Sequence, residues 1–183
     1  MSLQYAILGF LSIQPMSGYD LKKVFDGSVG HFWTADQAQI YRILTRLVDE
    51  GLVEVDHIPQ QGKPDRNEHR LTRDGQDELN DWLASPQDPQ PTREPFLVKV
   101  FFAGRLGREE AQRLLAERIE AAEQLLEVLN GVAAAVDEEY AGETVDLEQQ
   151  LRIATLDNGI RHTQAEIDWA EALLDQTRLE DQK

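Results

Sequence analysis

The sequence predicts a mainly α-helical chain with one small β-hairpin, and three observations support this fold class. Four of the seven prolines lie in residues 85–95, SPQDPQPTREP, a composition that neither a helix interior nor a central strand tolerates. Before this segment, stretches with helical spacing flank one stretch that alternates as a strand does. After it, two long series repeat apolar residues with a period of about 3.5. We therefore expect one domain over residues 1–84, a linker over 85–95 and a helical domain over 96–183.

Two short helices are expected at the start of the chain. The first has apolar residues at helical spacing and should end near Pro15. The second begins with Ser17 and Asp20, which resemble a capping box, and should stop between Gly27 and Gly30. Their apolar faces consist of Leu3, Ala6, Ile7, Phe10 and Leu11 in the first helix and Leu21, Val24 and Phe25 in the second.

A third helix has the clearest pattern in the first domain. Thr34 and Gln37 have the spacing of a capping box, and the helix should end at Gly51. One face of this helix then carries the apolar residues Ile40, Ile43, Leu44, Leu47 and Val48.

A hairpin and a fourth helix should complete the first domain. Residues 52–58, LVEVDHI, alternate between apolar and polar, and residues 68–71, EHRL, can return as a second strand after a turn at residues 62–65. Thr72 is expected to cap the fourth helix. The buried side of that helix would carry Leu79, Trp82 and Leu83.

Composition excludes several classes of protein. The chain is 41% hydrophobic and 28% charged, which is typical of a soluble globular protein, and no apolar run approaches the ~20 residues that span a bilayer. The absence of cysteine excludes disulfides and thiolate chemistry and favours the cytoplasm. No two of the four histidines have the i, i+4 spacing of a helical metal pair, and no serine lies in a nucleophile elbow. We therefore expect neither an enzyme nor a bound metal or other cofactor.

Three helices followed by a hairpin predict a winged helix-turn-helix domain, in which the third helix enters the major groove of DNA. The core residues of that helix point one way, so polar side chains remain on the other side. Gln suits adenine, Arg suits guanine or phosphate, and a Tyr hydroxyl suits phosphate. The predicted DNA-binding residues of this helix are Gln37, Tyr41, Arg42 and Thr45 on the outer face, with Gln39 and Arg46 on its flanks.

The turn of the hairpin is basic, although the chain has a formal net charge of -16. Gly62 permits the turn and Pro64 stiffens it, so Lys63 and Arg66 are expected to reach phosphate oxygens or the minor groove. The alternative is that this turn is an ordinary solvated loop. Arg70 and Arg73 are expected to be plain surface residues, paired with Asp74 or Asp77.

These motifs resemble the PadR family of bacterial transcriptional regulators. The resemblance rests on WTADQAQIYRILTRLVDEGLVEV and GKPDRNEHRLTRDGQDELNDWL, and EPFLVKVFFAGRL with the distant Trp169 is similar to the longer subfamily. Two positions depart from the family pattern: Lys63 replaces the usual Arg, and His69 stands where an aromatic residue is common. The residues that match the pattern are Tyr41, Leu44, Leu47, Gly51, Leu52, Gly62, Pro64, Leu71, Thr72 and Gly75. The resemblance implies a homodimeric DNA-binding regulator, most often a repressor, that reads a palindromic operator and has a three-helix C-terminal dimerisation domain.

The second domain contains two apolar series that must be buried, either against each other or in a second subunit. The helix that precedes them, PFLVKVFFAG, is apolar nearly all round and suits an element covered on several sides. The first series is Leu115, Ile119, Ala122, Leu126, Leu129, Ala133 and Val136, and the second is Ile153, Leu156, Ile160, Thr163, Ile167, Ala170 and Leu174.

Some members of the PadR family release DNA when they bind a small aromatic compound or a hydrophobic drug, so the resemblance suggests an effector. Four aromatic residues could line an effector pocket near a dimer interface: Phe96, Phe101, Phe102 and Trp169. The alternative is that these residues are ordinary core.

A second function remains open, because the first domain is itself acidic. Residues 1–84 contain 8 Lys and Arg against 13 Asp and Glu. Such a charge balance also suits a winged-helix adaptor that binds protein and does not use DNA.

Overall fold

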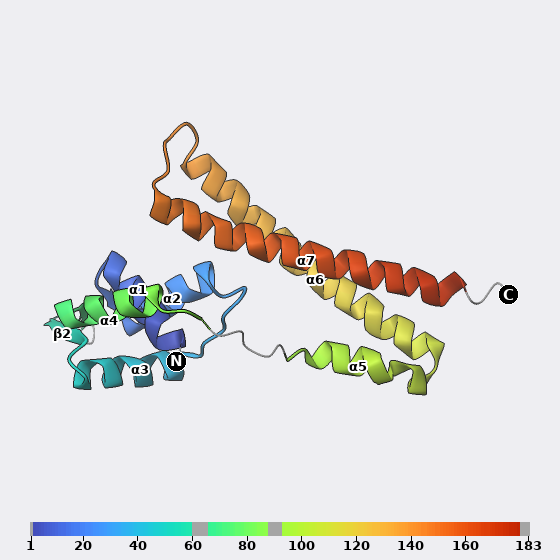
Figure 1. Cartoon of the computed structure of the whole chain (residues 1–183), viewed down its shortest axis with the longest axis horizontal. Helices are drawn as coiled ribbons and strands as arrows, with labels where there is room; N and C mark the ends of the chain where they lie inside the picture. The colour runs from blue at the N-terminus through green and yellow to red at the C-terminus, as the bar shows by residue number, and fades with distance from the viewer. Residues whose placement is uncertain (1, 60–65, 88–92, 180–183) are drawn as a thin grey trace. The chain divides into compact units, whose positions relative to one another are not determined.

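The structure is a computed structural model that describes residues 2–59, 66–87 and 93–179. The chain divides into two compact units, Met1–Pro89 and Gln90–Lys183 (Figure 1). Within the described ranges, no helix is long and apolar enough to cross a membrane.

The first unit contains four helices and a small antiparallel sheet. Its elements are α1 (Ser2–Ile13), β1 (Met16–Ser17), α2 (Gly18–Ser28), α3 (Gln37–Asp49), β2 (Val53–Ile58), β3 (Arg66–Leu71) and α4 (Arg73–Ala84). The order of helices and the hairpin agree with the sequence prediction, and the winged-helix fold is confirmed. Strand β1 was not predicted, because two residues are too short to show an alternating pattern. It extends the hairpin to a three-stranded sheet in the order β1-β3-β2, with Met16 opposite His69.

The core of the first unit is formed mainly by α1, α2 and α3. Ile7, Leu8, Ile40 and Leu47 are fully buried, and the ring of Phe25 is 1% exposed. The expected buried side of α4 was partly wrong. Leu79 is buried, whereas Leu83 is 65% exposed because it lies one residue past the side of the helix that faces the core.

Helix α3 begins later than the sequence suggested. Its N-cap is Asp36, not Thr34, and Asp36 forms a complete capping box with Gln39. The carboxylate of Asp36 accepts the Gln39 backbone N–H at 2.7 Å, and the Gln39 side chain accepts the Asp36 backbone N–H at 3.2 Å. The helix ends before Gly51, whose φ of 74° requires the left-handed conformation that glycine adopts without strain.

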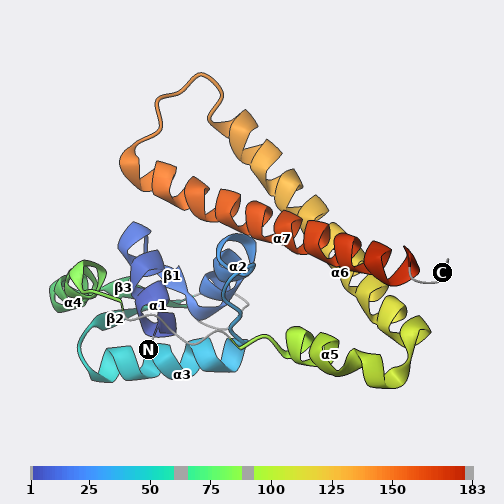
Figure 2. The ribbon, with the colours of Figure 1, turned by 45° about the vertical axis from the view of Figure 1, so that its right-hand side comes forward.

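The described elements of the second unit are all helices. They are α5 (Pro95–Ala103), a single 3₁₀ turn η1 (Gly104–Leu106), α6 (Arg108–Glu139) and α7 (Leu147–Leu179). The two long helices pack against each other, and they cross at an angle in both Figure 1 and Figure 2. The predicted apolar series meet in this pair: the buried members are Leu115, Ala122 and Leu129 of α6 and Thr163, Ile167, Ala170 and Leu174 of α7.

Helix α5 differs from its prediction. Ala103 is buried, but the side chains of Leu97, Val98, Phe101 and Phe102 are 49%, 58%, 82% and 56% exposed. Among the described residues, α6 and Trp169 of α7 pack against this helix and leave these four side chains exposed.

Candidate nucleic-acid interface

A groove lies between α3, the start of α2 and the hairpin. It has a volume of about 620 Å³ and an open mouth. Tyr41 and Thr45 contribute from α3, Gly18 and Tyr19 from α2, and Arg66 from β3. The further lining residues are Ser17, Leu44, Val48, Asp49, Val55, His57, Asn67 and His69.

The outer face of α3 carries the predicted DNA-binding side chains. Gln37, Tyr41, Arg42 and Thr45 are all exposed, and the Tyr41 side chain is 44% accessible. Thr45 donates its hydroxyl to the Tyr41 carbonyl at 3.1 Å, which leaves the hydroxyl oxygen as an acceptor toward solvent. These side chains are thus accessible to a ligand that approaches α3 from outside.

The two flanking residues of α3 have structural contacts. Gln39 is half-buried and takes part in the helix cap described above. Arg46 donates from Nη2 to the Gln4 side chain of α1 at 2.6 Å, and its Nε lies 3.6 Å from the Glu50 carboxylate. Both residues therefore help to fix α3 in place, whatever else they contact.

Gly18 supports Tyr41 in a way that the sequence pattern did not reveal. A Cβ atom on Gly18 would lie 2.6 Å and 2.8 Å from ring carbons Cε1 and Cζ of Tyr41. The tyrosine ring therefore packs directly over the start of α2, and any side chain at position 18 would displace it. The SGYDL stretch carried no signal for this contact, because glycine at a helix start usually serves only the backbone.

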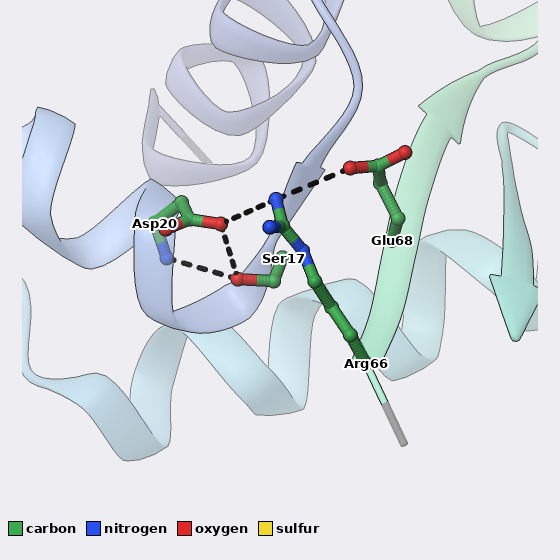
Figure 3. A network of polar contacts seen from close by, with 4 residues as sticks. All are labelled: Ser17, Asp20, Arg66 and Glu68. Carbon is green, nitrogen blue, oxygen red and sulfur yellow. Dashed lines mark hydrogen bonds and ion pairs between the residues drawn. The ribbon is translucent and has the colours of Figure 1, made fainter. Parts of the chain in front are cut away.

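Arg66 is held in a polar network at the first residue of β3, opposite Ile58 at the end of β2 (Figure 3). Its Nη2 lies 2.9 Å from Oδ2 of Asp20 and 3.2 Å from Oε1 of Glu68. Asp20 Oδ2 also accepts the hydroxyl of Ser17 at 2.6 Å. The other predicted wing residue, Lys63, lies outside the described residues.

Arg70 is an exposed strand residue with partners other than those expected. Its Nη2 lies 3.0 Å from Glu54 and 3.7 Å from Asp56, both on β2. The expected pairing with Asp74 or Asp77 was wrong, because the antiparallel register places Arg70 directly opposite Glu54.

His69 is buried between the sheet and α1 and is only 8% exposed. Its Nδ1 has no hydrogen-bond partner among the residues that the structure describes. Burial lowers the pKa of the imidazole below its ordinary value of 6.5, because the charged form loses its hydration, and a hydrogen bond with the Met16 backbone partly opposes this shift. A neutral imidazole here replaces the aromatic ring that the family pattern favours.

The four aromatic residues considered for an effector pocket form two separate pairs in the second unit. The rings of Phe96 and Trp169 lie 6.3 Å apart, with the Arg118 guanidinium 5.1 Å above the Phe96 ring. Phe101 and Phe102 lie 5.0 Å apart. Phe102 lines a cavity of about 480 Å³ together with the basic residues Lys99, Arg105 and Arg113. The apolar lining of that cavity also includes Ala103, Leu106 and Leu114.

Three packed helices, a hairpin wing and a polar outer face on the third helix together define the first unit as a winged helix-turn-helix domain. In the described ranges, no cluster of His, Cys, Asp or Glu could hold a metal ion. The outer face of the third helix is accessible for binding.

Comparisons with known proteins agree with this class. Residues 7–81 match the PadR-like family of transcriptional regulators, and residues 92–178 match the virulence activator alpha C-terminal domain. The negative transcriptional regulator PadR of Bacillus subtilis (strain 168) is 36% identical over 130 residues, which cover 70% of this chain and 71% of that protein. The chain belongs to the PadR-like family of transcriptional regulators.

Solved structures of Bacillus subtilis PadR are similar along nearly the whole chain. The crystal structure in complex with operator DNA has a TM-score of 0.83 at 30% identity and covers 97% of this chain and 99% of that one. The crystal structure in complex with p-coumaric acid has a TM-score of 0.78 at 28% identity, with the same coverage.

Proposed function

We propose that this protein is a sequence-specific DNA-binding repressor that acts as a homodimer on a palindromic operator. The exposed polar face of α3 beside the groove is the observation that carries this proposal. Tyr41 and Thr45 face the groove, while Gln37 and Arg42 extend the same outer surface of the helix. The PadR structure solved with operator DNA supports the assignment.

Each part of the chain has a separate role in this proposal. Residues 1–84 bind DNA, residues 85–95 connect, and residues 96–183 form the dimer. The exposed apolar residues of α5 supply surface for a second copy. A two-fold dimer presents α3 twice, and its two recognition helices enter successive major grooves about 34 Å apart.

The proposed contacts with DNA are of two kinds: some recognise base edges, and others bind phosphates and position the domain. Arg42, Gln37 and Thr45 read base edges, while the Tyr41 hydroxyl binds phosphate. Gln39 and Arg46 contribute mainly by holding α3, since both have partners within the domain. Lys63 and Arg66 bind phosphate from the wing.

A small aromatic acid is the proposed effector class, by analogy with the p-coumaric acid complex of PadR. The Phe96–Trp169 pair and the Phe101–Phe102 pair both offer aromatic edges in the second unit. Binding there releases the protein from DNA if the effector favours a dimer with a different spacing of its α3 helices.

Selection of bound fragments from the host genome tests the DNA function directly. The wild-type chain should enrich fragments near its own coding sequence, and affinity should fall steeply as salt rises, because phosphate contacts release counterions. Salt-independent binding, or no enrichment, would favour the adaptor that uses the winged fold for protein contacts.

Two substitutions test the recognition helix. Arg42→Ala and Tyr41→Ala should each weaken binding to the selected fragment about 10- to 100-fold. Arg161→Ala is the matched control, since Arg161 is also an exposed helix arginine but lies in the second unit and pairs with Asp157 of its own helix. Unchanged binding by both α3 variants would contradict the assignment of α3 to the major groove.

A further inference from the structure

Arg66 is the only lysine or arginine among the described residues that line the groove. It stands at the first position of β3, where the hairpin strand leaves the turn. Its guanidinium lies between α2 and β3 and contacts one carboxylate from each (Figure 3). The cation best placed to meet DNA at this end of the groove is therefore already engaged within the protein.

The charges around Arg66 are unfavourable for a phosphate. Two carboxylates, Asp20 and Glu68, share a single guanidinium, and Asp49 also lines the groove. Asp20 is held firmly, because it stands three residues after the N-cap Ser17 and accepts the Ser17 hydroxyl. A phosphate that approaches Arg66 thus meets a local excess of negative charge.

We propose that Asp20 and Glu68 reduce the affinity of this protein for DNA by holding Arg66 in an intramolecular ion pair that a DNA phosphate must replace. This inference rests on the proposed DNA-binding function. The side chains of Arg66, Asp20 and Glu68 are 42%, 37% and 25% exposed, so the pair is partly hydrated and weak enough to exchange. When a phosphate binds Arg66, both carboxylates lose their cation and repel the incoming backbone.

The opposite role would be that the two carboxylates orient Arg66 toward DNA. Both contacts use the same nitrogen, Nη2, which Asp20 and Glu68 flank in Figure 3. One carboxylate would suffice to orient the guanidinium and would leave the pair neutral toward phosphate. Two carboxylates leave a net negative charge, and this stoichiometry favours competition over orientation.

The test uses the full-length protein and the fragment that wild type binds most tightly in the genomic selection. Asp20→Asn and Glu68→Gln should each tighten binding about three- to tenfold in low salt, since each removes a charge that repels phosphate. Glu54→Gln and Asp56→Asn are the matched controls. These two acids surround Arg70, another exposed strand arginine with two carboxylate partners, and lie outside the groove lining.

Arg66→Ala, made both alone and together with Asp20→Asn and Glu68→Gln, distinguishes the effect of the ion pair from a general effect of negative charge. In the wild-type background Arg66→Ala should weaken binding no more than about twofold. The phosphate contact that this change removes is largely offset in wild type by the ion pair that DNA must break. In the Asp20→Asn, Glu68→Gln background the same change should cost about tenfold or more. Arg70→Ala should have equal, small effects with and without Glu54→Gln and Asp56→Asn.

Three outcomes would overturn the inference. Equal losses for Arg66→Ala in both backgrounds would mean that the carboxylates act only as diffuse charge. Weaker binding by Asp20→Asn and Glu68→Gln would mean that they orient Arg66. Failure of wild type to bind any selected fragment would remove the proposed function and the inference with it. Thermal unfolding of each variant checks the fold, and Glu68→Gln leaves the Ser17–Asp20 contact intact if Asp20→Asn is destabilising.

Discussion

The two units of this chain bury their apolar residues to very different degrees. In the first unit Ile7, Leu8, Ile40 and Leu47 are completely inaccessible, and the helices close around them within one chain. In the second unit α6 and α7 bury only the seam between them, and Phe101 remains 82% exposed. The difference indicates that the first unit needs no partner for its core, whereas the second exposes apolar surface that another subunit can cover.

The largest expected effect is on the closed core of the first unit. Leu47→Ala should lower the free energy of unfolding by about 2–5 kcal/mol, because it leaves a cavity beneath α3. Leu83→Ala, at a 65% exposed position of the same unit, should cost less than about 0.5 kcal/mol. Urea unfolding by fluorescence in a Trp169→Phe background reports on this unit, since Trp33 and Trp82 both belong to it. Similar losses for both variants would contradict the comparison of buried and exposed positions.

The exposed face of α5 should matter only for association. Phe101→Glu should weaken dimerisation about 100-fold, because a phenylalanine side chain loses about 2–3 kcal/mol of burial and a charge enters an apolar interface. Leu83→Glu places the same charge on an exposed leucine of the first unit and should leave the dimer unchanged. Sedimentation across a range of protein concentrations measures both. A wild-type protein that stays monomeric would show that the exposed surface of α5 has another use.

Glycine to alanine changes should have opposite signs in the two units. A Cβ atom on Gly75 would lie 2.1 Å from the backbone oxygen of Leu52, so Gly75→Ala should destabilise the first unit by about 1–3 kcal/mol. A Cβ on Gly131 in α6 meets nothing within 4 Å, so Gly131→Ala should stabilise the long helix by about 0.5–1 kcal/mol. Thermal unfolding of the two variants measures both changes in stability. A loss of stability in both variants would mean that Gly131 is packed closely against another group, such as a second subunit.

Much of the fold could be predicted because it follows from periodic patterns. The seam of α6 and α7 repeats over many turns, and the buried positions of α3 recur at helical spacing. Short or local features gave weaker signals. Strand β1 has only two residues, and the cap of α3 was misplaced because Thr34 and Asp36 both have a glutamine three residues later.

The candidate site was less predictable than the fold. The outward side of α3 followed directly from the position of its core residues, so Tyr41, Arg42 and Thr45 could be chosen in advance. The contact between Gly18 and Tyr41, and the capture of Arg66 by Asp20, join residues 23 and 46 positions apart. No local pattern encodes such contacts, because they depend on how α2 packs against α3 and the hairpin.

The smallest effect concerns His69, the one buried residue of the first unit whose ring nitrogen lacks a partner among the described atoms. Its folded-state pKa is lowered by burial, so the unfolded chain binds the proton more readily. Stability from this group is fully present above pH 6.5, the ordinary value, and is lost as the pH falls below it. His69→Phe should abolish this loss between pH 7 and 5.5 and raise the unfolding free energy by no more than about 1 kcal/mol, since it removes the unpartnered Nδ1 but also loses the hydrogen bond with the Met16 backbone. Urea unfolding at a series of pH values measures both quantities. If the variant keeps the wild-type pH profile, groups other than His69 cause the loss of stability in acid, and the buried imidazole does not weaken the core of the first unit.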